Sequence, residues 1–194
     1  MLFYTLYTDG YSDPNPGRGG WGYVLLDCNG IEVHRGNGGF KMTTNNRMEL
    51  YGVLKGLNSI RDASRVLVKS DSKYVVYGIS RWIRKWVRTD YDGKKNRDLW
   101  EGIWRMMNYH TVSSVWVKGH NGNKYNEIAD SLASCGGSIL NDLSEDIGYD
   151  ASSKGFYGKE KNEGRFVRRG DYEKAVKGNI TLEHRLNRVL IIND

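Results

Sequence analysis

The chain opens with a short apolar run that ends abruptly on a carboxylate and a glycine, Asp9 and Gly10. Residues 1–7 hold too few polar side chains to leave one face in water, so we predict a central strand buried on both faces. At the carboxyl ends of strands in α/β sheets, side chains leave the packed interior and can converge on a ligand. Asp9 is therefore a candidate site residue, although an Asp-Gly pair alone is also typical of an ordinary turn.

The next segments predict strands and then a helix. Residues 10–20 are dense in glycine, proline, asparagine and aspartate, and we expect a loop there. Residues 21–26 and 31–40 are typical of strands joined by an Asn-Gly hairpin turn, so the sheet should open with antiparallel strands. Residues 45–60 predict a helix, because apolar side chains recur at helical spacing behind threonines and asparagines suited to an N-cap.

A second apolar strand, predicted over residues 65–70, also ends on a carboxylate, that of Asp71. If helices cross over between parallel strands, neighbouring strand ends bring Asp9 and Asp71 to one edge of the sheet. Glu49 lies on the apolar side of the predicted helix, where glycines permit close approach to the sheet. A first-turn acid favoured by the helix dipole is the plainer explanation of Glu49 taken alone.

The last predicted strand and helix supply two more candidates. A strand is expected at 112–117, followed by a glycine-flanked loop that carries His120. A helix is expected at 124–135, with Asp130 near its inward face. A lone histidine in a polar loop is usually a surface residue, but a position beyond a strand end favours the site.

The helical region between residues 72 and 107 contains a basic stretch that bears tryptophans. Trp82 and Trp86 stand one helical turn apart among the cations Arg81, Arg84, Lys85, Arg88, Lys94, Lys95 and Arg97. Cations that contact phosphates, beside rings that stack on bases, are typical of nucleic-acid surfaces. A solvated basic face with two core tryptophans would give the same pattern. The net charge of +6 lies entirely within residues 1–140 and indicates a polyanionic partner, or simply a soluble domain.

The clustered acids indicate metal binding. If Asp9, Glu49, Asp71 and Asp130 meet, each pair of charges about 4 Å apart repels by roughly 4 kcal/mol at an effective dielectric constant near 20. Divalent cations relieve this repulsion, and all-oxygen ligands select Mg²⁺ or Mn²⁺. Two such ions about 3.5 to 4 Å apart stabilise the attacking and leaving oxygens of a phosphoryl displacement. Beside a basic surface, this site predicts cleavage of a nucleic acid.

The cysteines and the apolar segments predict the compartment. Cys28 and Cys135 lie far apart in apolar surroundings, so we expect buried thiols rather than a disulfide or a metal pair. We identify no secretory signal and no membrane span. We therefore expect a cytoplasmic protein with no membrane partner.

The order of the motifs resembles type 1 ribonuclease H (the ribonuclease HI family) over residues 1 to about 138. The resemblance rests on the blocks Thr-Asp-Gly at 8–10, Asn-Pro-Gly at 15–17, Thr-Thr-Asn-Asn-Arg-Met-Glu-Leu at 43–50, Asp-Ser-Lys-Tyr-Val at 71–75, Gly-Ile at 78–79, Trp-Ile at 82–83, Trp86, Asn96, Asp-Leu-Trp at 98–100, Trp-Val-Lys-Gly-His at 116–120, Asn-Glu at 126–127, and Asp130. It implies an α/β ribonuclease H-like fold, in which a mixed five-stranded sheet of three antiparallel strands and then parallel strands has helices on both faces.

The resemblance also implies an activity. The chain would be an endonuclease that hydrolyses the RNA strand of RNA/DNA hybrids and leaves 5′-phosphate and 3′-hydroxyl ends. Two Mg²⁺ ions, which Mn²⁺ could replace, would bind to Asp9, Glu49, Asp71 and Asp130. His120 would assist proton transfer or product departure.

The resemblance assigns substrate contacts as well. Asn15 and Asn45 would lie in the minor groove, where 2′-hydroxyls mark the RNA strand, with Asn46 nearby. Thr44 and Asn96 would hold a DNA phosphate. The DNA strand would be gripped by a basic protrusion at 81–97, which includes Trp82, Arg84, Lys85, Trp86, Arg88, Lys94 and Lys95.

This chain departs from the family pattern at three places. Met42 stands where an arginine serves the DNA phosphate pocket, with Lys41 beside it as a substitute. Lys73 stands where a glutamine often touches the RNA strand, and the basic protrusion is shortened before Lys94. Because no carboxylate is affected, we expect altered affinity or site preference with catalysis retained.

The chain continues for more than fifty residues beyond the expected catalytic domain at 1–140. Residues 141–164 are polar and predict a linker, and residues 165–194 predict an extension with one or two short helices. The apolar stripe Leu182, Leu186, Val189 and Leu190 is expected to dock on the chain's own domain or on a partner, with the protein itself a monomer. A small nucleic-acid module at Arg165, Arg168 and Arg169 is disfavoured by the neutral charge of residues 141–194.

Two other functions compete with the hybrid nuclease. One is a non-catalytic module that binds RNA/DNA hybrids, which four clustered acids disfavour because binding alone has no use for them. The other is a different nuclease on the same fold, such as a resolvase or exonuclease. The loop with His120 and the basic stretch with its tryptophans disfavour that alternative.

Overall fold

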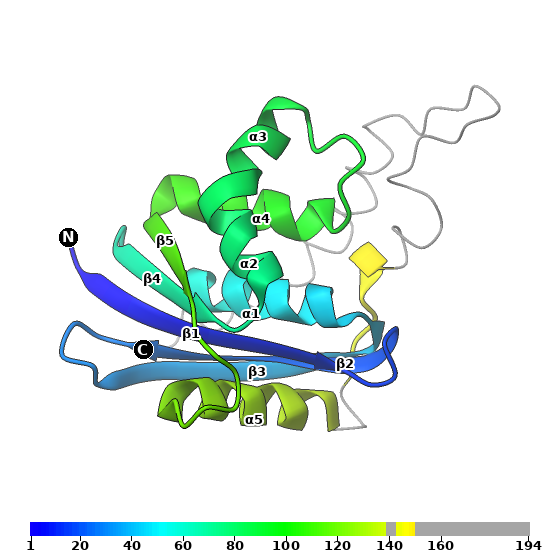
Figure 1. Cartoon of the computed structure of the whole chain (residues 1–194), viewed down its shortest axis with the longest axis horizontal. Helices are drawn as coiled ribbons and strands as arrows, with labels where there is room; N and C mark the ends of the chain where they lie inside the picture. The colour runs from blue at the N-terminus through cyan, green and yellow to red at the C-terminus, as the bar shows by residue number, and fades with distance from the viewer. Residues whose placement is uncertain (139–142, 150–194) are drawn as a thin grey trace, which may run out of the picture. The chain divides into compact units, whose positions relative to one another are not determined.

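The computed structural model describes residues 1–138 and 143–149, and its centre is a five-stranded sheet in the order β3-β2-β1-β4-β5. Strands β1, β2 and β3 pair antiparallel, whereas β1 pairs parallel with β4 and β4 with β5. The mixed sheet expected from the sequence is therefore confirmed (Figure 1). The strands are β1 (Phe3–Ser12), β2 (Gly17–Leu26), β3 (Glu32–Thr43), β4 (Arg65–Ser70) and β5 (Thr111–Trp116).

Helices cover both faces of this sheet. Helix α1 packs on β1 and β2 and also contacts α4, while α5 packs on β1, β2 and β3 from the opposite side (Figure 1). A π-helical turn joins α2 to α3, and both precede α4 along the chain. The bounds are α1 (Asn45–Asn58), α2 (Lys73–Tyr77), the π-helical turn (Gly78–Trp82), α3 (Ile83–Arg88), α4 (Arg97–Tyr109) and α5 (Lys124–Ser138).

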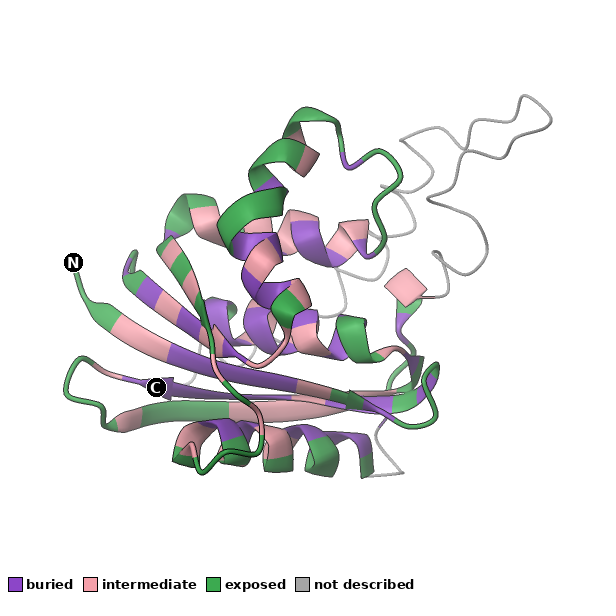
Figure 2. Ribbon diagram, viewed as in Figure 1, coloured by how far each residue is buried: buried purple, intermediate pink, exposed green. Residues whose placement is uncertain are grey.

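The main core lies between α1, α4 and the sheet. Leu6 of the central strand is fully buried, as are Val53 and Leu57 of α1 and Trp100 of α4. Figure 2 shows the middle of β1 as buried, and buried segments on α1 and α4 that alternate with intermediate and exposed ones. Truncating such side chains typically costs about 2–5 kcal/mol, so the strand ends stand on a rigid base. Burial of β1 is confirmed for its middle, although residues 1–3 are exposed.

The loop expected over residues 10–20 is wrong for most of its length. β1 continues to Ser12 and β2 already begins at Gly17, with Ser12 opposite Gly19 in the antiparallel register. The glycines serve packing instead of turning. A Cβ at Gly20 would lie 2.2 Å from the Ala133 carbonyl oxygen, so only glycine allows α5 to lie this close to β2.

The expected burial of the cysteines is also wrong. Both Cys28 and Cys135 are exposed and unpaired. Cys28 lies in the turn between β2 and β3, and Cys135 lies on the outer face of α5, because that helix turns Ala129 and Ala133 toward the sheet. No helix among the described residues is long and apolar enough to cross a bilayer.

Residues 143–149 fall within the stretch expected to be a linker, yet they pack on the domain. Leu143 and Asp146 are buried, and the Lys41 amide donates a hydrogen bond to the Ser144 carbonyl oxygen at 3.1 Å. Their polar composition predicts a linker, because the residues that they pack against lie about a hundred positions earlier and do not show in the local sequence. The remaining boundaries, at residue 140 and from 150 onward, lie outside the described residues and stay predictions.

Candidate active site

Three of the four predicted carboxylates meet at one edge of the sheet. Asp9 lies on β1, Asp71 follows the neighbouring parallel strand β4, and Glu49 projects from α1. One oxygen atom from each of these carboxylates lies within 4.8 Å of the others. Gly10 makes this approach possible, because a Cβ there would lie 2.1 Å from the Glu49 backbone nitrogen.

Burial and the repulsion of neighbouring charges weaken the ionisation of two of these acids, Asp9 and Glu49. Desolvation, and then the charges of Asp71 and Asp130, raise the pKa of Asp9 from 3.8 to about 7, although the Gly10 amide donates a hydrogen bond to its carboxylate at 2.7 Å. Burial and the charges of Asp9 and Asp71 raise the pKa of Glu49 well above its usual value. Its Oε2 atom is enclosed and has no hydrogen-bond partner among the described residues. An oxygen-only, crowded and partly desolvated set of this kind fits a hard divalent cation.

Asp130 and His120 stand at the margin of this group. Asp130 lies on α5, outside the tight carboxylate cluster, but its charge still contributes to the raised pKa of Asp9. The imidazole Nδ1 of His120 lies 3.7 Å from an Asp130 oxygen, and the histidine side chain is 82% exposed. The loop before it is pressed against the site, since a Cβ at Gly119 would lie 2.4 Å from the Asp71 carboxylate.

Asn126 is a site residue that the sequence reasoning missed. Its side-chain amide lies at the start of α5, is buried, and donates a hydrogen bond to Asp71 Oδ2 at 3.4 Å. Its Oδ1 atom is enclosed without a partner in the described part of the chain. The available signal was its spacing, because Asn126 precedes Asp130 by one helical turn and so lies on the same side of α5.

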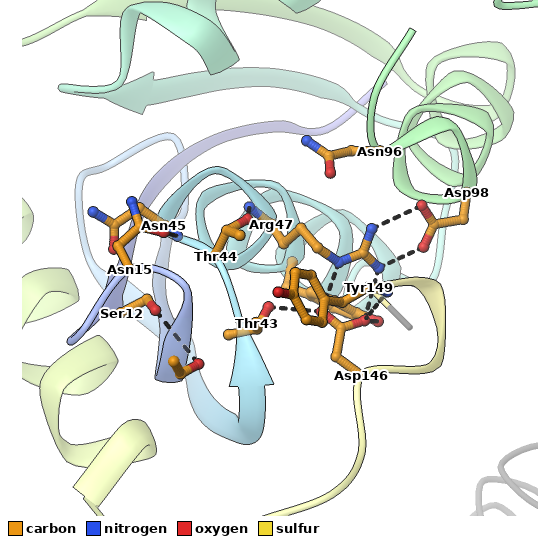
Figure 3. Close-up of polar contacts among 12 residues, drawn as sticks. Ser12, Asn15, Thr43, Thr44, Asn45, Arg47, Asn96, Asp98, Asp146 and Tyr149 are labelled. Atoms are coloured by element: carbon orange, nitrogen blue, oxygen red, sulfur yellow. Dashed lines mark hydrogen bonds and ion pairs between the residues drawn. The ribbon is translucent and has the colours of Figure 1, made fainter. Parts of the chain in front are cut away.

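The expected minor-groove residues cluster at the start of α1. The Asn45 backbone N–H donates a hydrogen bond to the Asn15 side-chain oxygen at 3.3 Å, and the two side chains lie beside each other in Figure 3. Thr44 is the N-cap, and its hydroxyl accepts a hydrogen bond from the Arg47 amide at 3.4 Å. Asn46 is exposed beside them.

Asn96 joins this surface from the start of α4. Its backbone is left-handed, with a φ of 59°, and its side-chain amide donates a hydrogen bond to the Tyr74 hydroxyl at 3.2 Å. The residue is only 8% exposed. The fold therefore brings residues from two helix starts, α1 and α4, to the same part of the molecule (Figure 3).

The basic stretch forms α3 and the loop after it, which stand away from the sheet (Figure 1). Trp82 is 37% exposed and its ring centroid lies 5.6 Å from that of Trp86, which in turn packs on the buried Trp100. Trp86 therefore ties the stretch to the buried core, while the ring of Trp82 remains partly exposed to solvent. The cations around it are exposed, and no ion pair among the described residues engages any of them: Arg84, Lys85, Arg88, Lys94 and Lys95.

The structure shows what surrounds two of the positions that depart from the family pattern, Lys73 and Met42. The Lys73 ammonium lies 5.8 Å from the ring centroid of Trp116, whose indole N–H donates to the Asp71 carbonyl oxygen at 2.9 Å. Lys73 thus stands beside the strand end that carries a catalytic candidate. Met42 is 44% exposed, and the Lys41 ammonium pairs with Glu145 at 3.2 Å.

Comparison with known proteins identifies the family. The RNase H family model matches residues 3–138. Ribonuclease H of Pseudomonas fluorescens is 43% identical over 136 residues, which cover 68% of this chain and 88% of that protein. Ribonuclease HI of Synechocystis sp. is 44% identical over 135 residues, covering 66% and 84% respectively.

Solved structures agree with this relation. The fold is similar to that of LC9-RNase H1, described as a type 1 RNase H with the type 2 active-site motif, at a TM-score of 0.65 and 28% identity over 71% of this chain and 72% of that chain. It is also similar to LC11-RNase H1, solved in complex with an RNA/DNA hybrid, at a TM-score of 0.53 and 23% identity over 69% and 96% of the two chains.

The fold and the acidic strand-end site define a nuclease of the ribonuclease H-like class. The chain belongs to the RNase H family, on its type 1 branch, and is an enzyme of that family.

The raised pKa of Asp9 predicts an unusual pH dependence of stability. The folded state keeps a proton on Asp9 that the unfolded chain releases, so without divalent metal the free energy of unfolding should fall as pH rises from about 4 to about 7. Asp9→Asn should flatten this decline and stabilise the fold at pH 8 by a few kcal/mol at most, on the order of 1–3. Urea denaturation in EDTA across this pH range measures both effects.

The control for this experiment is Asp62→Asn, which removes an exposed carboxylate and should leave the pH profile unchanged. Equal pH slopes for the wild-type protein and Asp9→Asn would contradict the assignment of the buried proton.

Asn126 predicts a second effect, on metal affinity. Asn126→Ala removes the donor that orients Asp71, and supporting residues of this kind usually contribute about 10–100-fold to metal affinity. Calorimetric titration with Mg²⁺ should show a loss in that range. Ser134→Ala, on the exposed face of the same helix, is the matched truncation and should bind Mg²⁺ normally. Unchanged affinity in Asn126→Ala would show that Asp71 is held by other contacts.

Proposed function

We propose that the chain hydrolyses the RNA strand of RNA/DNA hybrids as an endonuclease and leaves 5′-phosphate and 3′-hydroxyl ends. The observation that carries this proposal is the convergence of the Asp9, Glu49 and Asp71 carboxylates within 4.8 Å at the strand ends of an RNase H-family chain. Exposed cations that have no ion-pair partner in the described part of the chain, together with indole rings on the same domain, provide the surface that a polyanionic duplex needs.

The acids would hold the catalytic metal. Asp9, Glu49, Asp71 and Asp130 would bind two Mg²⁺ ions, with Mn²⁺ as a substitute, and the bound ions would stabilise charge on the attacking and leaving oxygens of the phosphodiester. The raised pKa of Asp9 and of Glu49 means that these groups release protons when a cation binds. Asp9 is only 8% exposed, so its carboxylate is largely shielded from water.

His120 is suited to proton transfer. Its imidazole is exposed and lies 3.7 Å from Asp130, so it can reach a substrate or product oxygen without leaving the site. The close contact of Gly119 with Asp71 fixes the start of this loop against the metal ligands.

The surface beside the acids would select the hybrid. Asn15 and Asn45 lie together where they can meet a minor groove, whose 2′-hydroxyls distinguish RNA from DNA. Thr44 and Asn96 stand at the starts of α1 and α4, where helix N-termini favour a phosphate. The cations of α3 and its following loop, and Lys73 beside Asp71, would contact further phosphates.

The decisive experiment is cleavage of an end-labelled RNA/DNA hybrid in Mg²⁺, Mn²⁺ or EDTA, with double-stranded DNA and double-stranded RNA in parallel. We expect metal-dependent cutting of the RNA strand alone. Asp9→Asn should slow cutting by more than about a hundredfold, since losing even a residue that supports a metal ligand can cost that much. Asp62→Asn should cut normally. A folded wild-type protein that binds hybrid but never cuts it would instead be a non-catalytic binding module.

We further propose a cytoplasmic monomer whose extension at 165–194 docks on its own domain or on a partner. Free surface cysteines fit a reducing compartment. The support for docking is the apolar stripe from Leu182 to Leu190, which is too short to form a stable helix alone. These residues lie outside the described part of the chain. Limited proteolysis should show protection of 165–194, and cleavage at the rate of a free peptide would disprove docking.

A further inference from the structure

A fully buried arginine links the starts of the two helices that carry the proposed phosphate-binding residues. Arg47 lies in the first turn of α1 and its side chain is 1% exposed. Its guanidinium donates to both oxygens of Asp98 in the first turn of α4, at 3.0 and 2.6 Å. Such a bidentate pair is directional as well as strong, so it fixes how the two helix starts face each other (Figure 3).

A second carboxylate completes this cluster from much later in the sequence. Asp146 accepts hydrogen bonds from Arg47 Nε at 2.6 Å and from Arg47 Nη2 at 2.7 Å, and its side chain is fully buried. It also accepts a hydrogen bond from the Thr43 hydroxyl at 2.6 Å and one from the Tyr51 hydroxyl at 3.3 Å. Because burying a guanidinium costs several kcal/mol unless it is fully paired, Asp146 is needed to keep Arg47 in place.

The segment around Asp146 is built to reach this position. Residues 143–149 run beside the end of β3. Ser144 forms a β-bridge with Phe40, and its carbonyl oxygen accepts a hydrogen bond from the Lys41 backbone amide. A Cβ at Gly148 would lie 1.9 Å from an Asp98 oxygen, so only glycine lets the chain pass over the ion pair. We call residues 143–149 the closing segment.

The cluster directly adjoins the proposed substrate contacts. Thr43, which donates to Asp146, precedes the N-cap Thr44, whose hydroxyl accepts the Arg47 amide. Asp98, on the other side of Arg47, lies two residues after Asn96. A shift of Arg47 would therefore move Thr44 and Asn96 relative to each other.

We infer that Asp146 is a positioning residue for hybrid binding: through Arg47 it sets the spacing between Thr44 and Asn96, which together receive one phosphate of the DNA strand. The closing segment lies beyond the family match at 3–138, yet on this inference it helps to shape the surface that binds the hybrid. This inference rests on the proposed function, because it requires that the face binds a hybrid.

The test compares Asp146→Asn, which keeps the shape and removes the charge, with Asp62→Asn. Asp62 is the control because its carboxylate is exposed and it lies between α1 and β4, outside the residues proposed to bind the hybrid. Asp146→Asn should raise KM for the hybrid about tenfold, the effect of one good contact, and leave kcat nearly unchanged. Asp62→Asn should change neither constant.

A modified substrate separates positioning from simple destabilisation. A neutral methylphosphonate is moved stepwise along the DNA strand of the hybrid, and the wild-type protein should lose affinity at one step. In Asp146→Asn the same replacement should cost much less, because the two changes remove one interaction and are not additive. A lower melting temperature with wild-type KM and full methylphosphonate sensitivity would overturn the inference.

Two further outcomes are distinguishable. If Asp146→Asn fails to fold, Thr43→Val is used instead, because it removes only the 2.6 Å hydrogen bond to Asp146 and should raise KM by a smaller factor. An unchanged KM in Thr43→Val would then overturn the inference. If the wild-type protein itself neither binds nor cuts the hybrid, the proposed function fails, and the positioning role fails with it.

Discussion

Helix α1 rests on the central strand with almost no space between the two backbones, and the rest of the site depends on this contact. Glycine permits it on both sides: a Cβ at Gly10 would collide with the Glu49 backbone, and one at Gly52 would lie 3.1 Å from the Asp9 carbonyl oxygen. The consequence is that Glu49 is held beside Asp9 and Asp71, despite their mutual repulsion. Packing of the core thus supplies the free energy that keeps three acids together.

The carboxylate cluster and the cations of α3 and its loop lie in different parts of the domain. Burial raises the pKa of Asp9 and of Glu49, while those cations are exposed and have no ion-pair partner among the described residues. Arg47 differs from these cations, since its side chain is buried between Asp98 and Asp146 and cannot contact a ligand directly. Surface cations are therefore available to a polyanion, whereas the buried cation serves the geometry of the fold.

Much of this arrangement could be predicted from the sequence. The apolar strands that end on Asp9 and Asp71, and the helical spacing around Glu49, locate the carboxylates because strand and helix periods are local properties. The glycine-rich start of β2 predicts a loop from its own composition, because the packing role of Gly20 depends on α5, which lies more than a hundred residues later. Asn126 and Asp146 were missed for a related reason: a polar residue shows its burial only when its partners are known.

The ion pair between Arg47 and Asp146 spans 99 positions of the chain, and this separation has a consequence for folding during synthesis. When the ribosome has released only the first three strands and α1, the guanidinium of Arg47 has neither Asp98 nor Asp146 to pair with. The helix must then stay loosely docked, or the arginine must remain hydrated, until the closing segment emerges. Completion of this interior therefore waits for nearly the whole domain, as expected for a fold rich in long-range contacts.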